Sequence, residues 1–149
     1  MAFGVSPTDP GRAVIEAVYG LNQGLVDGDV APDAWILDRQ DGTVVTHRPP
    51  ERERAMRPVS GPGGEGVVLV PLSPGEKTRP PLSPATIAEV FHMLRAAEAL
   101  FGAPQDMEWT FRGGRLFVLQ SRPVTTAGGG ADGADNRAWY LSQHRSLDT

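Results

Sequence analysis

The most regular pattern of apolar positions in the chain has helical spacing and lies between residues that commonly bound helices. Ser83 is suited to the N-cap, and Pro84 after it fits the first turn of a helix. Gly102 is typical of the residue just past a helix end, and Pro104 follows it closely. We therefore predict a helix over residues 84–101. The apolar positions spaced to share one face of it are Ile87, Val90, Phe91, Leu94 and Phe101.

Most other apolar runs are short, rich in β-branched residues and bounded by turn residues, which is typical of strands. The pair Asp41-Gly42 is a hairpin-turn signal between two of these runs. The predicted strands cover residues 13–18, 34–39, 43–47 and 67–72.

The segments between these strands carry turn and breaker residues. Residues 20–28 include three glycines and predict a turn or a short distorted helix. Residues 48–66 are polar and interrupted by prolines, so we expect a surface excursion there. Residues 73–82 are also rich in proline and glycine, and we expect a loop.

Two further runs, 106–111 and 115–120, form the clearest hairpin of the sequence, and the length of its loop decides its register. A two-residue loop would pair Arg112 with Arg115 and place Glu108 beside Leu119. A three-residue loop would pair Phe111 with Arg115 and place Asp106 opposite Gln120, with Gly114 in the left-handed conformation. We prefer the three-residue loop because it separates an apolar face from a polar one. The apolar face would then be Met107, Trp109, Phe117 and Leu119, and the polar face Asp106, Glu108 and Gln120.

Length and composition indicate one domain with a core of its own. The chain has 149 residues, enough to bury about two thirds of its unfolded surface. Its 18 glycines and 14 prolines exceed the average for a domain and indicate many turns. We expect an α+β domain, mainly an antiparallel sheet, with the 84–101 helix packed on the apolar face of the hairpin.

Charge and residue usage exclude several classes of function. The net charge is −4 and the basic residues are scattered, so we expect no nucleic-acid binding. Without cysteine the chain has neither disulfides nor thiolate metal sites. No window reaches the ~18 apolar residues of a membrane span, and residues 1–10 lack the features of a signal peptide. We therefore expect no membrane partner and a cytoplasmic location.

The polar face of the 106–120 hairpin carries the candidate chemistry. Asp106, Glu108 and Gln120 would form a cluster of hard oxygen ligands, which Mg²⁺ prefers and commonly shares with substrate phosphates. Arg122 continues the same strand face, and its planar guanidinium suits phosphate oxygens. A metal ion and an arginine together are how phosphoryl-transfer sites neutralise the moving group. The alternative from spacing alone is a solvated strand face followed by an ordinary Arg-Pro.

Two stretches resemble a known family. The run Gln105-Asp106-Met107-Glu108-Trp109, followed by Leu119-Gln120-Ser121-Arg122-Pro123-Val124-Thr125, is similar to the end of the ATP-grasp domain of phosphoenolpyruvate synthase, pyruvate phosphate dikinase and rifampicin phosphotransferase. That family reads roughly Pro-Gln-Asp-Ile-Glu-Trp and then Leu-Gln-x-Arg-Pro-Ile-Thr. An earlier stretch, Ile15-Glu16-Ala17-Val18-Tyr19-Gly20-Leu21 with Gly24 to Gly28 and Pro32-Asp33, also resembles it. The resemblance covers about residues 3–126.

The resemblance implies ATP and Mg²⁺ as ligands and gives each candidate residue a role. Glu108 would bind Mg²⁺ and the ATP phosphates, Gln120 would share that metal or contact phosphate, and Arg122 would be the catalytic residue that holds the transferring phosphates. Asp106 and Glu16 would lie near the nucleotide, although Glu16 also fits a structural residue with a partner. The chain departs from the family where Gly-Leu-Gly-Glu is replaced by Gly20-Leu21-Asn22-Gln23, so a role that needs a carboxylate at position 23 is in doubt.

The resemblance also divides the chain and implies partners. Residues 1–126 would form the second half of an ATP-grasp domain, 127–136 a glycine-rich linker, and 137–149 a tail that could begin a further domain. The lysine-bearing first subdomain and the domain with a phosphorylated histidine would be partners, on the same or on another chain. Lys77 matches no family phosphate lysine, and the histidines at positions 47, 92 and 144 lack the expected surroundings.

Three functions remain open at this point. The first is the ATP- and Mg²⁺-binding part of a phosphoenolpyruvate synthase-like phosphotransferase, incomplete as an enzyme by itself. The second is a non-catalytic remnant of the same family that binds a nucleotide weakly or binds a protein partner. The third is an unrelated α+β domain whose carboxylates have no role in binding.

Overall fold

The computed structural model describes residues 2–3 and 9–124, which form a six-stranded antiparallel sheet, a separate two-stranded hairpin and three helices. The order of the strands in the large sheet is β4-β3-β2-β1-β7-β8. These strands are Val44–Arg48 (β4), Asp33–Asp38 (β3), Arg12–Ala17 (β2), Ala2–Phe3 (β1), Gln105–Arg112 (β7) and Arg115–Pro123 (β8). The α+β expectation is confirmed in this coarse form, with mostly antiparallel strands and few helices. The proposed linker and tail, 127–149, lie outside the described residues.

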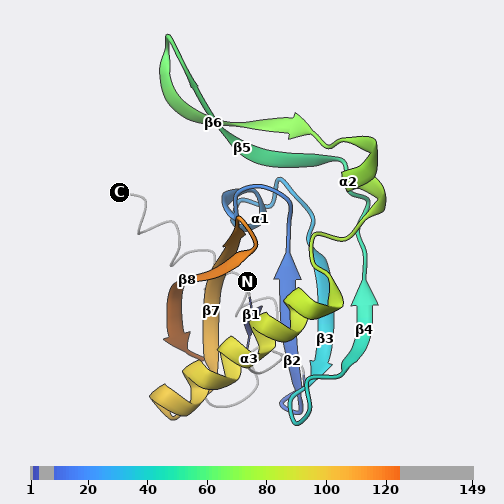
Figure 1. Cartoon of the computed structure of the whole chain (residues 1–149), viewed down its shortest axis with the longest axis vertical. Coiled ribbons are helices and arrows are strands. Elements are labelled where there is room, and N and C mark those ends of the chain that lie inside the picture. Colours follow the sequence, from blue (N-terminus) through green and yellow to red (C-terminus); the bar gives the residue numbers. More distant parts are fainter. Residues whose placement is uncertain (1, 4–8, 125–149) are drawn as a thin grey trace.

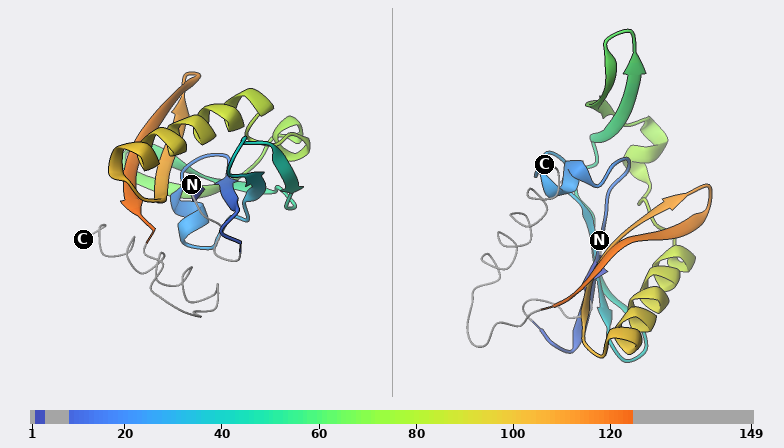
Figure 2. Two further views of the ribbon diagram at one scale, coloured as in Figure 1. Left: turned by 90° about the horizontal axis from the view of Figure 1, so that it is seen from below. Right: turned by 90° about the vertical axis from the view of Figure 1, so that its left-hand side faces the viewer.

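The helix α3 (Pro84–Phe101) runs along one face of the large sheet (Figures 1 and 2). Its start is fixed by a reciprocal cap: Ser83 Oγ accepts from Thr86 N, and Thr86 Oγ1 accepts from Ser83 N at 2.7 Å. Its end is fixed by Gly102, which has a φ of 71°. The predicted bounds of this helix are therefore confirmed.

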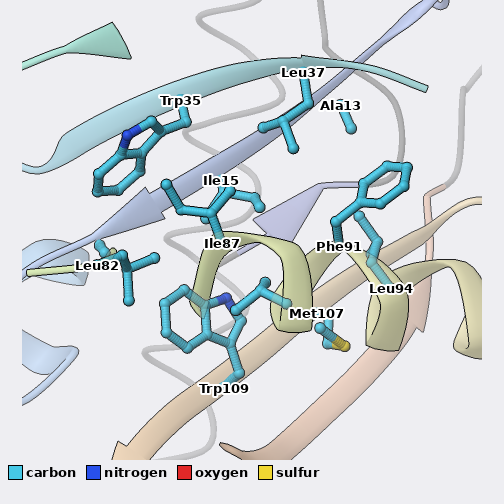
Figure 3. Packing of buried hydrophobic residues seen from close by; sticks show 12 residues of the cluster. Ala13, Ile15, Trp35, Leu37, Leu82, Ile87, Phe91, Leu94, Met107 and Trp109 are labelled. Carbon is cyan, nitrogen blue, oxygen red and sulfur yellow. The ribbon is translucent and has the colours of Figure 1, made fainter. Parts of the chain in front are cut away.

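The core lies between α3 and the sheet (Figure 3). Ile87, Val90, Phe91 and Leu94 supply the helix side, as the periodicity predicted. Phe101, predicted on the same face, is 56% exposed at the last residue of the helix and does not join the core. Alternation along β2, β3 and β7 supplies the sheet side, because every second residue of a strand points to the same face. These sheet residues are Ala13, Ile15, Ala17, Trp35, Leu37, Met107 and Trp109.

An ion pair at the far end of α3 ties the helix to the β3–β4 turn. Glu98 is 8% exposed, and its two carboxylate oxygens accept from Arg39 Nη1 and Nη2 at 2.9 and 3.0 Å. Arg95, one turn earlier on the helix, donates to the same carboxylate at 3.0 Å. A charge buried to this extent needs such partners, so the cluster fixes how α3 lies on the sheet.

Two connecting segments differ from the sequence-based expectation. Residues 54–66, expected in a polar surface excursion, belong to the strands β5 (Arg54–Gly61) and β6 (Gly64–Pro71). They form a hairpin that projects beyond the end of the large sheet (Figure 1). Prolines did not prevent pairing, because Pro58 lies in a two-stranded ribbon in which each strand has a free edge. The loop expected over 73–82 contains the short helix α2 (Pro74–Thr78), capped by Ser73 and Glu76.

The glycine-rich segment after β2 forms the short helix α1 (Gln23–Val26), as one of the two alternatives predicted. Gly20 has a φ of 79°, and a Cβ atom on it would lie 2.4 Å from the backbone oxygen of Met56 in β5. The same oxygen accepts a hydrogen bond from Leu21 N at 2.7 Å. The loop before α1 is therefore held against β5 through the backbone.

Candidate functional site

The candidate residues lie on the face of the large sheet that is turned away from α3, which we call the distal face. Met107 and Trp109 are buried against α3, so the alternate residues Asp106, Glu108 and Thr110 of β7 point to the distal face. All three are only partly buried. This placement separates the candidate chemistry from the core.

The register of β7 and β8 brings two predicted ligands face to face. Glu108 pairs with Gln120, and Asp106 pairs with Arg122. Residues directly opposite on antiparallel strands point to the same face, with Cβ atoms about 4.5–5.5 Å apart. Four predicted site residues therefore form two adjacent rows on the distal face of the hairpin.

The predicted three-residue loop of this hairpin is wrong, yet Asp106, Glu108, Gln120 and Arg122 share one face of it. The loop has two residues, Gly113 and Gly114, with φ of 60° and 77°, and Arg112 pairs with Arg115. Both central residues have positive φ, as the tight turns favoured in hairpins require. A register shift between Glu108 and Trp109 then moves the pairing by one residue, which places Gln120 opposite Glu108 and Arg122 opposite Asp106. The predicted pairing of Asp106 with Gln120 is therefore wrong.

The two-residue turn also corrects the predicted apolar face. Phe117 pairs with Thr110 and Val118 with Trp109, so Phe117 belongs to the distal side of the ribbon. Phe117 and Leu119 are 43% and 60% exposed and do not join Met107 and Trp109 in the core. The extra residue could not be predicted from residue types, because a bulge changes pairing without requiring any particular one.

Glu16 lies on the same face at a greater distance. Ile15 of β2 and Met107 of β7 both pair with Ala2 of β1, so the residues that follow them, Glu16 and Glu108, lie in one row across the sheet. Two strand spacings separate their backbones, roughly 10 Å. Glu16 is thus at the edge of the group formed by the hairpin residues.

Arg122 is held by its neighbour on β8. With the amide oxygen of Gln120 turned toward the guanidinium, that oxygen accepts from Nε and Nη2 of Arg122. The amide orientation follows from these donors. Arg122 also lies across from Asp106, so an acceptor flanks the guanidinium on its own strand and a carboxylate on the next.

Asp106 carries the strongest electrostatic signal of the site. Burial raises the pKa of its carboxyl to about 7, and the neighbouring Glu108 carboxylate raises it further whereas Arg122 opposes the rise. Its Oδ1 atom is buried and finds no hydrogen-bond partner within the described part of the chain. A buried carboxylate oxygen in this position is a candidate for contact with a cation or a donor from a ligand.

The donor set fits a magnesium ion that is shared with phosphates. Carboxylates of Glu108 and Asp106 and the amide oxygen of Gln120 are the hard ligands this ion prefers. Within residues 2–3 and 9–124, no group of three or more histidines and carboxylates could hold a metal ion. Mg²⁺ commonly takes one or two carboxylates and completes its shell with water and phosphate oxygens, which agrees with this sparse set.

Asn22 is a site residue that the sequence analysis did not identify. Its Nδ2 atom donates to Glu108 Oε1 at 2.9 Å, from the loop that precedes α1. The only signal in the sequence was that Asn22 and Gln23 replace two residues of the pattern Gly-Leu-Gly-Glu. Only the missing carboxylate at position 23 was considered from the sequence, whereas it is Asn22 that contacts the predicted metal ligand.

The histidines in the described part of the chain are not placed at this site. The ring of His47 is stacked on Trp35 with centroids 4.7 Å apart, and its Nε2 lies 2.8 Å from Asp33. His92 is exposed on α3, next to Phe91 and on the opposite side of the sheet from Glu108.

None of the helices that the structure describes is long and apolar enough to cross a membrane.

Comparisons with known proteins match this chain to one family. Residues 1–138 match the family model described as pyruvate phosphate dikinase, AMP/ATP-binding domain. A probable phosphoenolpyruvate synthase of Archaeoglobus fulgidus is 32% identical over 115 residues, which is 77% of this chain and 15% of that protein. A rifampicin phosphotransferase of a Streptomyces species is 34% identical over 118 residues, 79% of this chain and 13% of that protein. The prodigiosin synthesizing transferase PigC of Serratia marcescens is 30% identical over 122 residues, 79% of this chain and 13% of that protein. The chain therefore spans about a seventh of the length of these relatives.

Proposed function

Because the chain belongs to the family of the pyruvate phosphate dikinase AMP/ATP-binding domain, we propose that its distal face binds the phosphates of ATP together with Mg²⁺. Nucleotide binding is the property that the family model describes. The metal, the roles of single residues and the ATP-grasp arrangement are our proposals. The observation that carries them is the pairing of Glu108 with Gln120 and of Asp106 with Arg122 in adjacent rows.

In this proposal the hairpin supplies a negative and a positive group to one metal–phosphate unit. Glu108 and Gln120 hold the metal, and Asp106 and Glu16 lie close to the nucleotide. Arg122 offers its guanidinium to the phosphate oxygens and is the residue proposed to stabilise the transferring group. Mg²⁺, when bound, would neutralise charge on the phosphate oxygens.

Two features of the site support these roles. The hydrogen bonds from Arg122 to Gln120 preorganise the guanidinium, which lowers the cost of orienting it for phosphate. The pKa of Asp106 is raised, mainly by burial and in spite of Arg122, so a bound metal ion would stabilise the charged form of this carboxyl further. Gln120 would then exchange its contact with Arg122 for the metal, or keep Arg122 in place and leave the metal to Glu108.

We further propose that this chain works as the second half of an ATP-grasp clamp, with cytoplasm as its location. A first subdomain with its lysine, and a domain carrying the histidine that accepts phosphate, would be its partners. The two histidines described here support that assignment to another domain, since neither lies beside Arg122. By itself the chain would bind nucleotide without turnover, because catalysis needs positioned groups on both walls of the site.

A non-catalytic module of the same family is the alternative, and the replacement of the expected glutamate by Gln23 favours it. Such a module would bind a protein partner and be indifferent to Mg-ATP. The site residues would then have no effect on any nucleotide property of the chain.

Calorimetric titration of the full 149-residue chain with Mg-ATP separates the two proposals. We expect weak binding in the wild type, at least ~10-fold weaker binding in Glu108→Gln and in Arg122→Ala, and ATP consumption at background level. Glu89→Gln is the matched control, because Glu89 is an exposed carboxylate on α3, on the other side of the sheet. Equal heats in all four proteins would refute the nucleotide site, and ATP turnover that is lost in Glu108→Ala would refute the inactivity of the chain.

A further inference from the structure

The side chain of Asn22 bypasses the contact that its position in the chain would favour. Asn22 is the N-cap residue of α1, where an asparagine commonly accepts a hydrogen bond from the first turn of the helix. No such side-chain cap is formed in this described helix, and the backbone of Asn22 is itself helical, with φ of −61°. The amide instead reaches across to the carboxylate of Glu108, 86 residues away, at 2.9 Å.

The loop that carries Asn22 is fixed independently of this contact. Leu21 N donates to Met56 O, and Gly20 packs so closely on the same oxygen that no side chain fits. On the other side, a Cβ atom on Gly24 would lie 2.8 Å from Val30, which indicates equally close packing. Asn22 therefore presents its amide from a rigid support between two closely packed glycines.

The chemistry of the contact suits a group that orients a carboxylate. An amide N–H₂ is a neutral donor, so it holds one oxygen of Glu108 and leaves the negative charge of the carboxylate to be balanced by a bound cation. A hydrogen bond to a charged acceptor is among the stronger ones and restricts the rotation of the carboxylate. Groups of this kind around a metal ligand commonly change metal affinity by about 10–100-fold when removed.

We propose that Asn22 is a positioning residue for the metal ligand Glu108, with its amide fixing the carboxylate in the orientation that receives the metal–phosphate unit. This inference rests on the proposed function of Glu108. It adds a residue from a different part of the chain, which joins the loop before α1 to the chemistry of the β7–β8 hairpin. It also accounts for the replacement of glycine at position 22, since a glycine has no side chain with which to reach Glu108.

A purely structural role is the competing explanation, in which the contact only tethers α1 to the hairpin. The two explanations differ in what the loss of the amide changes. A tether affects stability and all binding alike, whereas a positioning residue affects the part of nucleotide binding that depends on the metal.

The test compares nucleotide binding with and without metal in the full chain. The probe is the non-hydrolysable analogue adenylyl imidodiphosphate, with Mn²⁺ in place of Mg²⁺ so that water-proton relaxation reports the bound metal. We expect Asn22→Ala to weaken Mn²⁺-dependent binding by about 10-fold and to leave metal-free binding within about 2-fold of wild type. Asp27→Asn is the control, because Asp27 is exposed at the other end of α1 and its change should leave both values unchanged.

A second measurement follows the contact itself. The side-chain amide resonance of Asn22 should shift in the Glu108→Gln variant, which keeps the shape of the side chain but removes its charge. An unchanged resonance would contradict the hydrogen bond and with it the proposal.

The Glu108→Gln variant also separates a failure of the proposed metal–nucleotide site from a failure of the positioning role of Asn22. If it keeps the Mn²⁺-dependent binding, or if the wild type has none, the proposed function fails and this inference fails with it. If Glu108→Gln loses that binding while Asn22→Ala keeps it, the metal site stands and the positioning role is refuted. Equal losses with and without metal in Asn22→Ala would assign the contact to a structural tether.

Discussion

Glu108 lies directly opposite Gln120 although the turn of their hairpin predicts a different partner for it. From the two-residue turn, regular pairing would place Leu119 opposite Glu108 and turn Gln120 to the other face of the hairpin. The register shift between Glu108 and Trp109 makes Leu119 the additional residue of β8. Bulges commonly re-aim side chains next to functional sites, and this one places an amide where the proposed metal site needs it.

The corrected faces of the hairpin predict which of its apolar residues stabilise the fold. Trp109 is 7% exposed and packs in the core against α3, so Trp109→Ala should lower the free energy of unfolding by about 3–5 kcal/mol. Leu119 is 60% exposed, and Leu119→Ala should change it by less than about 0.5 kcal/mol. Urea denaturation of both variants measures the contrast. Similar losses in the two variants would mean that the apolar face preferred from the sequence was right after all.

The elements that the sequence predicted well are those fixed by local chemistry. The helix over 84–101 has its periodicity, its N-cap Ser83 and its terminal Gly102 within one continuous stretch. Its buried face was predictable for the same reason, since helical spacing decides which residues share a face. Distant parts of the chain were not needed to define this element.

The elements that the sequence predicted poorly depend on contacts between distant segments. Residues 54–61 pair with 64–71 although the composition of residues 54–66 indicates a loop, because pairing satisfies backbone groups whatever the side chains are. The bulge at Leu119 and the contact of Asn22 with Glu108 likewise depend on three-dimensional register. Strand alternation indicated Asp106, Glu108, Gln120 and Arg122, and a resemblance gave them roles and added Glu16. The structure adds that the first four share two adjacent rows.

The close packing of Gly20 predicts that Gly20→Ala lowers the stability of the fold more than the same substitution at Gly28. Gly20 and Gly28 have nearly equal φ, 79° and 78°, so alanine is strained to a similar degree at both. The added Cβ meets Met56 O at 2.4 Å at position 20, whereas at position 28 it meets no atom of the described chain within 4 Å. Gly28→Ala should cost about 1–2 kcal/mol, from backbone strain alone. Gly20→Ala should cost about 1–3 kcal/mol more, from the forced shift of β5. Thermal unfolding of both variants measures the difference, and equal costs would contradict the close approach of Met56.

The buried carboxylate of Asp33 predicts a large loss of stability outside the candidate site. Asp33 is 2% exposed and accepts from Arg52 Nε at 2.7 Å, from Arg52 Nη2, and lies 2.8 Å from His47 Nε2. Asp33→Ala should cost about 3–5 kcal/mol, because it leaves the mostly buried guanidinium of Arg52 without its carboxylate.

The surface pair of Arg12 and Asp38 is the control for this prediction. Both side chains are about one third exposed, at 35% and 34%, with a contact of 3.0 Å. Arg12→Ala should cost no more than about 1 kcal/mol. Chemical denaturation at neutral pH compares the two variants, and a cost for Asp33→Ala as small as that of Arg12→Ala would mean that Asp33 and Arg52 are not paired in solution.

The raised pKa of Asp106 predicts how stability depends on pH when metal is absent. Burial raises this pKa to about 7 in the folded chain, from the ordinary aspartate value of 3.8 in the unfolded chain. The folded state therefore binds the proton more tightly, so the contribution of Asp106 to stability is complete below about pH 4 and is lost as the pH rises through 7. A difference of about three pKa units corresponds to a loss of at most about 4 kcal/mol over this range.

Asp106→Asn removes this dependence, because an amide has the shape of the protonated carboxyl and does not ionise. In urea denaturation with EDTA between pH 4 and 8, the variant should gain stability relative to the wild type as the pH rises, and the two should converge near pH 4. Asp27→Asn, an exposed carboxylate on α1, is the control that should show no such divergence. A constant difference between Asp106→Asn and the wild type across this range would show that Asp106 titrates alike in the folded and unfolded chain. The distal face would then hold an ordinary solvated carboxylate, and its need for a cation would lose its main electrostatic support.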